Sequence, residues 1–534
     1  MTRGWSAGKL PRGTSGIRNA PPLFDALTAT AHDLQKALAD GKLRSTDLVQ
    51  EYVWRTEEYN GYLRAVAQYA PNAYERAQEL DEQRTSGQVA TGPLHGIPVL
   101  LKNTISTDAS LQMDTTAGAA ALIGSIPSKN TPLVDQLLDA GAIILGKATS
   151  SELNWNKDCN LPCGWSTVDG QSQSPYVFGG LRNIADDGLG GHSNPGGSST
   201  GVAVALAAGL APIGVGCDTE GSITAPAIRA SLYSMRPSTG LVSSQGVVPL
   251  AHSFDTPGPL AKDPEDLANL LDVLKTDSKV LTERNLPLTP KKLDWSSIKI
   301  GTLAPDRSPY PDFIVKPVEE ATEQATRETL KAYSTLKSLV GIYHENVDLP
   351  DVDAFNVGDD HSLYTVMDAE TQGDTDHYLQ SLSKSKVRSL QELVDWNKDN
   401  PDSSLPSEYQ GQSTLINCLE TVPKEKVEML RKHNLALGAK LEATLEKYGI
   451  DVIIGAGDSV FGMFAAANGS PISALPLSYL DFNGRAIGLV ALAGRHKEAE
   501  LLRFLDHYAT LFVRKPPLAF EDHKVPGKGL QGQL

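Results

Sequence analysis

Apolar residues recur at helical spacing near the start of the chain. Leu34 and Leu38 lie four residues apart, ahead of Gly41, which is typical of the residue that ends a helix. In residues 45–59 the apolar side chains fall on one face of a helix, and Ser45 occupies the expected N-cap. The pattern predicts two helices that cover a sheet.

The chain then alternates apolar runs with amphipathic segments. The run "GIPVLLKN", which contains Lys102, and residues 142–147 are both typical of buried strands. Between them, residues 131–141 predict a helix with Thr131 as N-cap and Gly141 at its end. Such alternation indicates a largely parallel sheet with helical cover.

A more polar and less periodic stretch occupies residues 275–445, with one strand-like run, "IKIGTLAP", and a helix expected from near Pro317. Core-like patterns return at "DVIIGAG" and "RAIGLVALAG", and "KEAELLRFLDHYATL" predicts an amphipathic helix. Because core-like segments flank the polar stretch, we expect one large domain over 23–515, with the polar stretch as a variable layer. Residues 1–22 and 516–534 are expected to be tails.

Composition narrows the classes of function. The 534 residues are 40% hydrophobic and 21% charged, as in ordinary globular proteins. A formal net charge of −16 argues against a broad nucleic-acid surface, which needs clustered Lys and Arg. The N-terminus lacks the apolar core of a secretory signal. The most apolar window, residues 201–216, is short and interrupted by Pro212, so we expect neither nucleic acid nor membrane as a partner.

The cysteines point to no metal or disulfide framework. Cys159, Cys163, Cys217 and Cys418 are few for 534 residues, and the first two lack the second pair that a zinc site needs. We therefore expect a cytoplasmic protein without a metal or cofactor.

Two clusters of glycine and serine carry the candidate chemistry. "NPGGSSTG" contains Ser198 and Ser199, and "DTEGS" ends at Ser222. Residues 200–209 between them predict a helix that rises about 15 Å, and residues 211–216 predict a strand that returns about 17–20 Å. Ser222 is therefore expected beside the first cluster.

Ser222 follows a predicted strand at a turn that Gly221 lets bend sharply. Successive N–H groups at such a turn form an anion pocket, and a nucleophile placed in it suits acyl transfer. Its base is better sought in Lys102 than in His192 or His252, which lack an obvious partner arrangement. Burial at the end of an apolar strand would lower the lysine pKa, and a neutral amine accepts a proton.

Other interpretations of these residues stay open at this point. Ser222 could be a turn serine, Ser198 a helix cap and Lys102 one member of a structural ion pair. "GSSTG" also fits the nucleophile-elbow pattern around Ser199, but loop-like residues precede it where an elbow needs a strand. Asn154 and Asp218 are weaker candidates for lining the pocket.

Several motifs together resemble the amidase signature family. They are "GGSSTG", "DTEGSI" 24 residues from Ser198 to Ser222, and "LHGIPVLLKN" around Lys102. Similar segments span roughly residues 25 to 515, and "TEGS" with "GQSQSPY" resembles the peptide-amidase-like and fungal branch. The resemblance implies a single α/β/α sandwich with a mixed central sheet.

The resemblance also implies the role of each site residue. Ser222 would be the acylated nucleophile, and Ser198, held with a cis peptide bond, would relay its proton to Lys102. Ser199 would support this network. The oxyanion would be bound by backbone N–H groups, those of Thr219, Glu220, Gly221 and Ser222. The implied activity is hydrolysis of a carboxamide, in a non-peptide or C-terminal linear amide, through an acyl-enzyme.

Three residues depart from the family pattern: Asn103, where many members carry Asp; Thr224, where an arginine is common; and Glu220, a carboxylate beside the oxyanion pocket. The alternatives are an acyl or amido transferase similar to the glutamyl-tRNA amidotransferase A subunit, and a catalytically silent binding protein. The expected partner is a small-molecule amide. Oligomeric state stays open, with a homodimer as one option.

Overall fold

The structure, a computed structural model, describes residues 21–87, 91–276, 294–517 and 520. The tails predicted at the two ends lie mostly outside these ranges. Within the described ranges, none of the helices is both long enough and apolar enough to cross a membrane.

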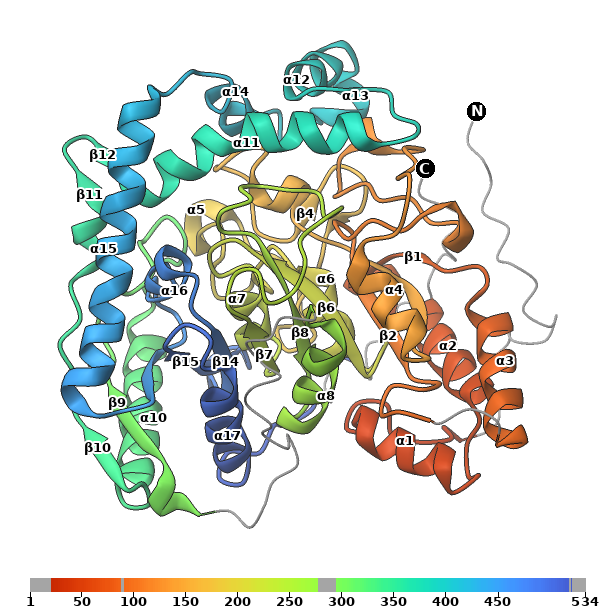
Figure 1. Ribbon diagram of the computed structural model, residues 1–534, viewed down its shortest axis with the longest axis horizontal. Helices are drawn as coiled ribbons and strands as arrows, with labels where there is room; N and C mark the ends of the chain where they lie inside the picture. The colour runs from red at the N-terminus through yellow and green to blue at the C-terminus, as the bar shows by residue number, and fades with distance from the viewer. Residues whose placement is uncertain (1–20, 88–90, 277–293, 518–519, 521–534) are drawn as a thin grey trace.

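One 11-stranded sheet forms the centre of the molecule (Figure 1). Its strands, in spatial order, are β1 (Val66–Tyr69), β3 (Ile143–Ala148), β2 (Pro98–Lys102), β6 (Ile213–Asp218), β8 (Thr256–Ala261), β7 (Tyr233–Arg236), β14 (Ile472–Tyr479), β15 (Ala486–Ala493), β13 (Val452–Ala456), β9 (Lys299–Thr302) and β10 (Ile342–His344).

The sheet is mixed. β2 pairs in parallel with β3 and β6, and β9 pairs in parallel with β10 and β13, whereas the other pairs are antiparallel. The largely parallel sheet predicted from strand–helix alternation is therefore wrong. A short connection between β14 and β15 makes an antiparallel hairpin, which needs no crossover helix. The mixed sheet implied by the family resemblance is confirmed.

Helices pack against this sheet in two groups. The first contains α4 (Pro132–Asp139), α8 (Pro264–Leu274) and α17 (Glu498–Ala509), with α1 (Ala31–Ala39) packed on α8. The second contains α6 (Thr200–Ala207), α7 (Thr224–Arg229) and α10 (Glu319–Lys337). At the β1 end of the sheet, α2 (Ser45–Leu63) packs against α3 (Ala73–Ser86), and α5 (Ile184–Asp187) lies in the long loop before α6. This arrangement agrees with the α/β/α sandwich that we expected.

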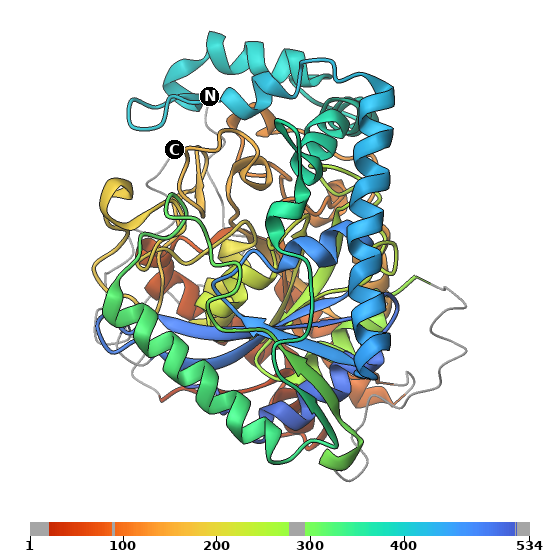
Figure 2. The ribbon, with the colours of Figure 1, turned by 90° about the vertical axis from the view of Figure 1, so that its left-hand side faces the viewer.

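The polar stretch contributes a helical layer, which we call the cap. It consists of α11 (Ser362–Ser381), α12 (Leu390–Asp399), α13 (Pro401–Ser404), α14 (Ser413–Asn417) and α15 (Lys424–Tyr448), with α16 (Gly462–Asn468) packed on α15. Figures 1 and 2 both show α11–α14 at the top of the molecule, above the sheet. A second hydrophobic cluster, separate from the main core, joins α11, α12 and α14 to the loops around Leu122, Leu153 and Val248.

Most predicted elements form within a residue or two of their expected ends, but the N-cap of α2 differs from the predicted one. Ser45 is its first helical residue rather than its N-cap, which is Arg44. The carboxylate of Asp81, from α3, accepts the N–H groups of Ser45 and Thr46 at 2.6 and 3.1 Å. A side chain distant in sequence thus replaces the local hydroxyl cap.

Helix α6 approaches β1 and β3 so closely that only glycine fits at residue 201. Its N–H donates to the carbonyl of Thr149 at 3.0 Å, and an added Cβ would clash with the carbonyl oxygen of Ala65 and the backbone of Thr149. The start of α6, and with it the Ser198–Ser199 loop, is therefore set by direct backbone contact.

We expect Gly201→Ala to destabilise the protein by about 1–3 kcal/mol, because backbone atoms must move to admit the methyl group. Gly373→Ala is the matched control. Gly373 is exposed in α11, and apart from its chain neighbours and the backbone of its own helix, no described atom lies within 4 Å of a Cβ added there. The control should stabilise the helix by about 1 kcal/mol. Thermal unfolding of the two variants measures both effects, and equal midpoints would contradict the packing argument.

Candidate active site

Lys102 ends β2 in the interior of the sheet, with none of its side chain exposed. Its Nζ lies 2.7 Å from Ser198 Oγ, 2.7 Å from Asn154 Oδ1 and 3.3 Å from the Cys217 carbonyl oxygen. None of these three partners is a carboxylate. A structural ion pair, the alternative interpretation of Lys102, is therefore not what the structure shows.

Burial lowers the pKa of Lys102 from 10.5 to about 8, against the opposing influence of Cys217, Asp218 and Asp255. An ammonium in this position has lost its water shell, which raises the free energy of the charged form. The neutral amine is therefore accessible close to neutral pH.

The glycine- and serine-rich loop before α6 presents Ser198 to this amine. The Gly197–Ser198 peptide bond is cis, as the family resemblance implies. Ser199 Oγ donates to the Cys217 carbonyl oxygen at 3.0 Å and accepts the Cys217 N–H at 3.2 Å. Ser199 therefore fastens this loop to the end of β6.

Ser222 lies beside the first serine cluster, as the helix and strand lengths predict. The Ser199 N–H donates to the Ser222 carbonyl oxygen at 3.0 Å. Ser222 is half-buried in the turn between β6 and α7, where Gly221 has a φ of 85°. That left-handed conformation favours glycine.

Asp218 shapes the turn that contains Ser222. Its carboxylate accepts the N–H of Gly221 at 2.9 Å and that of Ile223 at 2.5 Å, and it lies 3.3 Å from Nε of the buried Arg236. The N–H of Gly221 is thereby occupied, although the resemblance implies it as an oxyanion donor. For the N–H groups of Thr219, Glu220 and Ser222, no hydrogen bond is found within the described ranges.

Asp255 supports the same turn from the start of β8. Its carboxylate accepts the Thr219 hydroxyl at 2.5 Å and the N–H groups of Leu250 and Ala251 at 2.8 and 3.0 Å. Burial raises the pKa of Asp255 to about 6. The motifs in the sequence do not single out this residue. The available signal is an acidic side chain directly before the apolar strand "TPGPLA".

The three departures from the family pattern are all accommodated. Asn103 is buried and donates to Thr116 Oγ1 at 2.7 Å, and the buried Thr224 hydroxyl faces the Gly221 carbonyl at 3.4 Å. Glu220 lies close to Tyr364, from α11 of the cap. Burial raises the pKa of Glu220 to about 7, and the nearby negative charge of Asp218 is the second cause of this rise. Near neutral pH, a large fraction of this carboxyl is therefore uncharged.

The two histidines that ranked below Lys102 as a base have partners outside the site. His192 Nε2 lies 3.0 Å from the Lys316 carbonyl oxygen, and burial lowers the pKa of this imidazole to about 4. His252 is exposed and lies 2.9 Å from the carboxylate of Asp374. Within the described residues, the base closest to Ser198 is Lys102.

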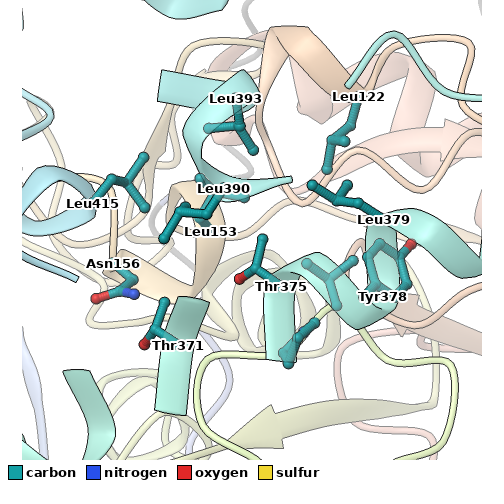
Figure 3. A pocket seen from close by; sticks show the side chains of 12 residues that line it. Leu122, Leu153, Asn156, Thr371, Thr375, Tyr378, Leu379, Leu390, Leu393 and Leu415 are labelled. Carbon is teal, nitrogen blue, oxygen red and sulfur yellow. The ribbon is translucent and has the colours of Figure 1, made fainter. Parts of the chain in front are cut away.

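Asn154 lies in a turn, Glu152–Trp155, between β3 and the long loop. On its cap side, the neighbouring Leu153 lines a cavity of about 20 Å³ with leucines from α11, α12 and α14, among them Leu379, Leu393 and Leu415 (Figure 3). That volume holds about one water molecule. The cap therefore packs closely against the turn that carries Asn154.

Comparison with known proteins supports this arrangement. Residues 47–456 match the family model described as Amidase. The chain is 30% identical over 510 residues to a probable amidase of Arabidopsis thaliana, covering 92% of each protein. The crystal structure of a peptide amidase from Stenotrophomonas maltophilia superposes with a TM-score of 0.78 at 27% identity, covering 92% of this chain and 98% of that one.

A glutamyl-tRNA(Gln) amidotransferase A subunit from Symbiobacterium thermophilum is 33% identical over 328 residues, which cover 59% of this chain and 62% of that protein. The similarities favour an enzyme over a catalytically silent binding protein. Because the family match spans most of the chain and the fold agrees with it, this protein belongs to the amidase family and is an amide hydrolase.

Proposed function

We propose that the protein hydrolyses the C–N bond of a small carboxamide through an acyl-enzyme on Ser222. The observation that carries this proposal is the short contact, 2.7 Å, between buried Lys102 Nζ and Ser198 Oγ. This contact lies next to the turn that contains Ser222, because the Ser199 N–H donates to the Ser222 carbonyl oxygen.

In the first step Ser222 Oγ attacks the amide carbon. Its proton passes to Ser198 Oγ as the Ser198 proton passes to the neutral amine of Lys102, which becomes an ammonium. The ammonium then returns a proton through Ser198 to the leaving nitrogen, and ammonia or an amine departs. Water, activated by the same relay, releases the acid and restores Ser222.

The negative charge on the tetrahedral oxygen needs donors that are already in place. The N–H groups of Thr219, Glu220 and Ser222 are the candidates, since Gly221 donates to Asp218. The Thr219 hydroxyl bond to Asp255 and the Asp218 bonds to the turn hold the backbone in one conformation. We assign the oxyanion pocket to these three groups.

Trapping the acyl group tests the proposal. The enzyme is mixed with a panel of primary carboxamides and peptide amides, quenched in acid and digested. A mass increase equal to the acyl group is expected on the peptide that contains Ser222, together with ammonia release. An acyl group on a different residue, or ammonia release from a cleaved amide with no acyl-peptide under single-turnover conditions, would contradict it.

An amidotransferase is the second candidate, because an amidotransferase A subunit is 33% identical over 59% of this chain. In that case the acyl group or ammonia would pass to a second acceptor and not to water. Glutamine-dependent amidation that requires a co-purified partner protein would favour this alternative. Ammonia released by the isolated chain in a one-to-one ratio with free acid would favour the hydrolase.

A further inference from the structure

The three groups around Lys102 differ in what they can do in a hydrogen bond. The Cys217 carbonyl oxygen only accepts, and so does Asn154 Oδ1. The Ser198 hydroxyl can donate or accept. A neutral amine has two N–H bonds and one lone pair. If its two hydrogens go to the two obligate acceptors, the lone pair is left facing Ser198.

The amide of Asn154 is held in the orientation that this count requires. Its Nδ2 donates to the Val248 carbonyl oxygen at 3.1 Å. Because a carbonyl cannot donate, the NH₂ group must face Val248 and the oxygen must face Lys102. The side chain is buried, with 6% exposed, so both contacts are shielded from bulk water.

The backbone at this point adopts an unfavourable conformation. Leu153, Asn154 and Trp155 have φ values of 51°, 61° and 72° in succession. The left-handed region is disfavoured for residues with a Cβ, although Asn tolerates it better than most. Such conformations persist where the surroundings fix them, and they are found at functional sites. Here the turn directs Asn154 at Lys102.

We propose that Asn154 is a positioning residue, which together with the Cys217 carbonyl turns the lone pair of neutral Lys102 toward the Ser198 hydroxyl. The inference rests on the proposed function and specifies how its relay is oriented. When the Ser198 proton moves to Nζ, the new ammonium has three N–H bonds and three acceptors already in place. The proton therefore transfers without rearrangement of the site.

Two substitutions that both tolerate the left-handed turn test this role. Asn154→Asp places a carboxylate beside Nζ, which favours the ammonium. The acid limb of the pH profile, where kcat/KM rises as Lys102 loses its proton, should move to higher pH by about 1–3 units. Asn154→Gly removes the acceptor without adding charge, so we expect a plateau about 100-fold lower and no upward movement of the limb. The other titratable groups facing Lys102, namely Cys217, Asp218 and Asp255, are unchanged in both variants.

Asn156→Asp is the matched control. Asn156 is equally buried, with 7% exposed, and its amide faces the Cys418 sulfur at 4.0 Å, away from Lys102. The acid limb of kcat/KM for Asn156→Asp should coincide with that of the wild type. The rate of fluorophosphonate labelling, measured against pH on the folded fraction of each variant, provides a readout that thermal destabilisation alone does not move.

An acid limb in Asn154→Asp that matches the wild type, or one that moves equally in Asn156→Asp, would overturn the inference. Failure of the proposed function gives a different result. In that case Ser222→Ala would retain turnover, whatever the behaviour of residue 154. If Ser222→Ala is inactive and the limb of Asn154→Asp does not move, only the positioning role is refuted.

Discussion

Replacing Ser222 with alanine is expected to lower the turnover of a cleaved carboxamide by about 10⁶-fold and to abolish labelling by a fluorophosphonate. Without the hydroxyl, no acyl ester can form. The turn itself should persist, because the carboxylate of Asp218 binds the N–H groups of Gly221 and Ile223, which the substitution leaves in place. Ammonia release and the intact mass after labelling measure the two effects.

Ser296→Ala is a suitable control for this experiment. Ser296 is exposed and hydrogen bonded to Asp294, outside the described site. The Ser296→Ala enzyme should be labelled by the fluorophosphonate and should turn over substrate, both at the wild-type rate. If Ser222→Ala retained both labelling and turnover, a different residue would have to be the nucleophile.

The second large effect is expected for Lys102→Met, which keeps the length of the side chain and removes the amine. Ser198 then has no base to receive its proton, and kcat/KM should fall by about 10²–10⁴-fold. In the wild type the base acts when neutral. Because the pKa of Lys102 is lowered to about 8, kcat/KM should rise tenfold per pH unit up to about pH 8 and level off above it. The residual activity of the variant should lack this limb.

Stability against pH provides an independent check on the same substitution. The folded protein loses the Lys102 proton near pH 8, whereas the unfolded chain keeps it until about pH 10.5. Between these values the unfolded state binds more protons, so the free energy of unfolding rises with pH. Lys102→Met should remove only the part of this rise that Lys102 contributes. Burial also lowers the pKa values of Lys147 and Lys262 to about 7, and these two lysines contribute equally in both proteins. If the kcat/KM of Lys102→Met still rose tenfold per pH unit up to about pH 8, the assignment of Lys102 as the base would be contradicted.

Local sequence patterns predict the elements near the site well. Strand β2 ends at Lys102 and α6 follows Ser199, because buried apolar runs and glycine stops define these elements from neighbouring residues. The proximity of Ser222 to Ser199 also follows, since it depends only on the length of one helix and one strand.

What the patterns miss depends on contacts between segments far apart in the chain. Asp255 reaches Thr219 across 36 residues, Asp81 caps α2 from α3, and Asn154 contacts Lys102 through an irregular turn. None of these leaves a periodic signal, because one side chain makes each contact. The strand order is missed for the same reason, since pairing between β7 and β14 joins residues more than 200 positions apart.

The cap has two hydrophobic attachments: α15, α16 and the first half of α11 belong to the main core, whereas α12, α14 and the end of α11 form the separate cluster. Leucines of the separate cluster, such as Leu379 and Leu393, share a cavity with Leu153, the neighbour of Asn154. Exchanging them for smaller or larger residues leaves the amine and the serine hydroxyls in place and affects the relay only through the turn that carries Asn154.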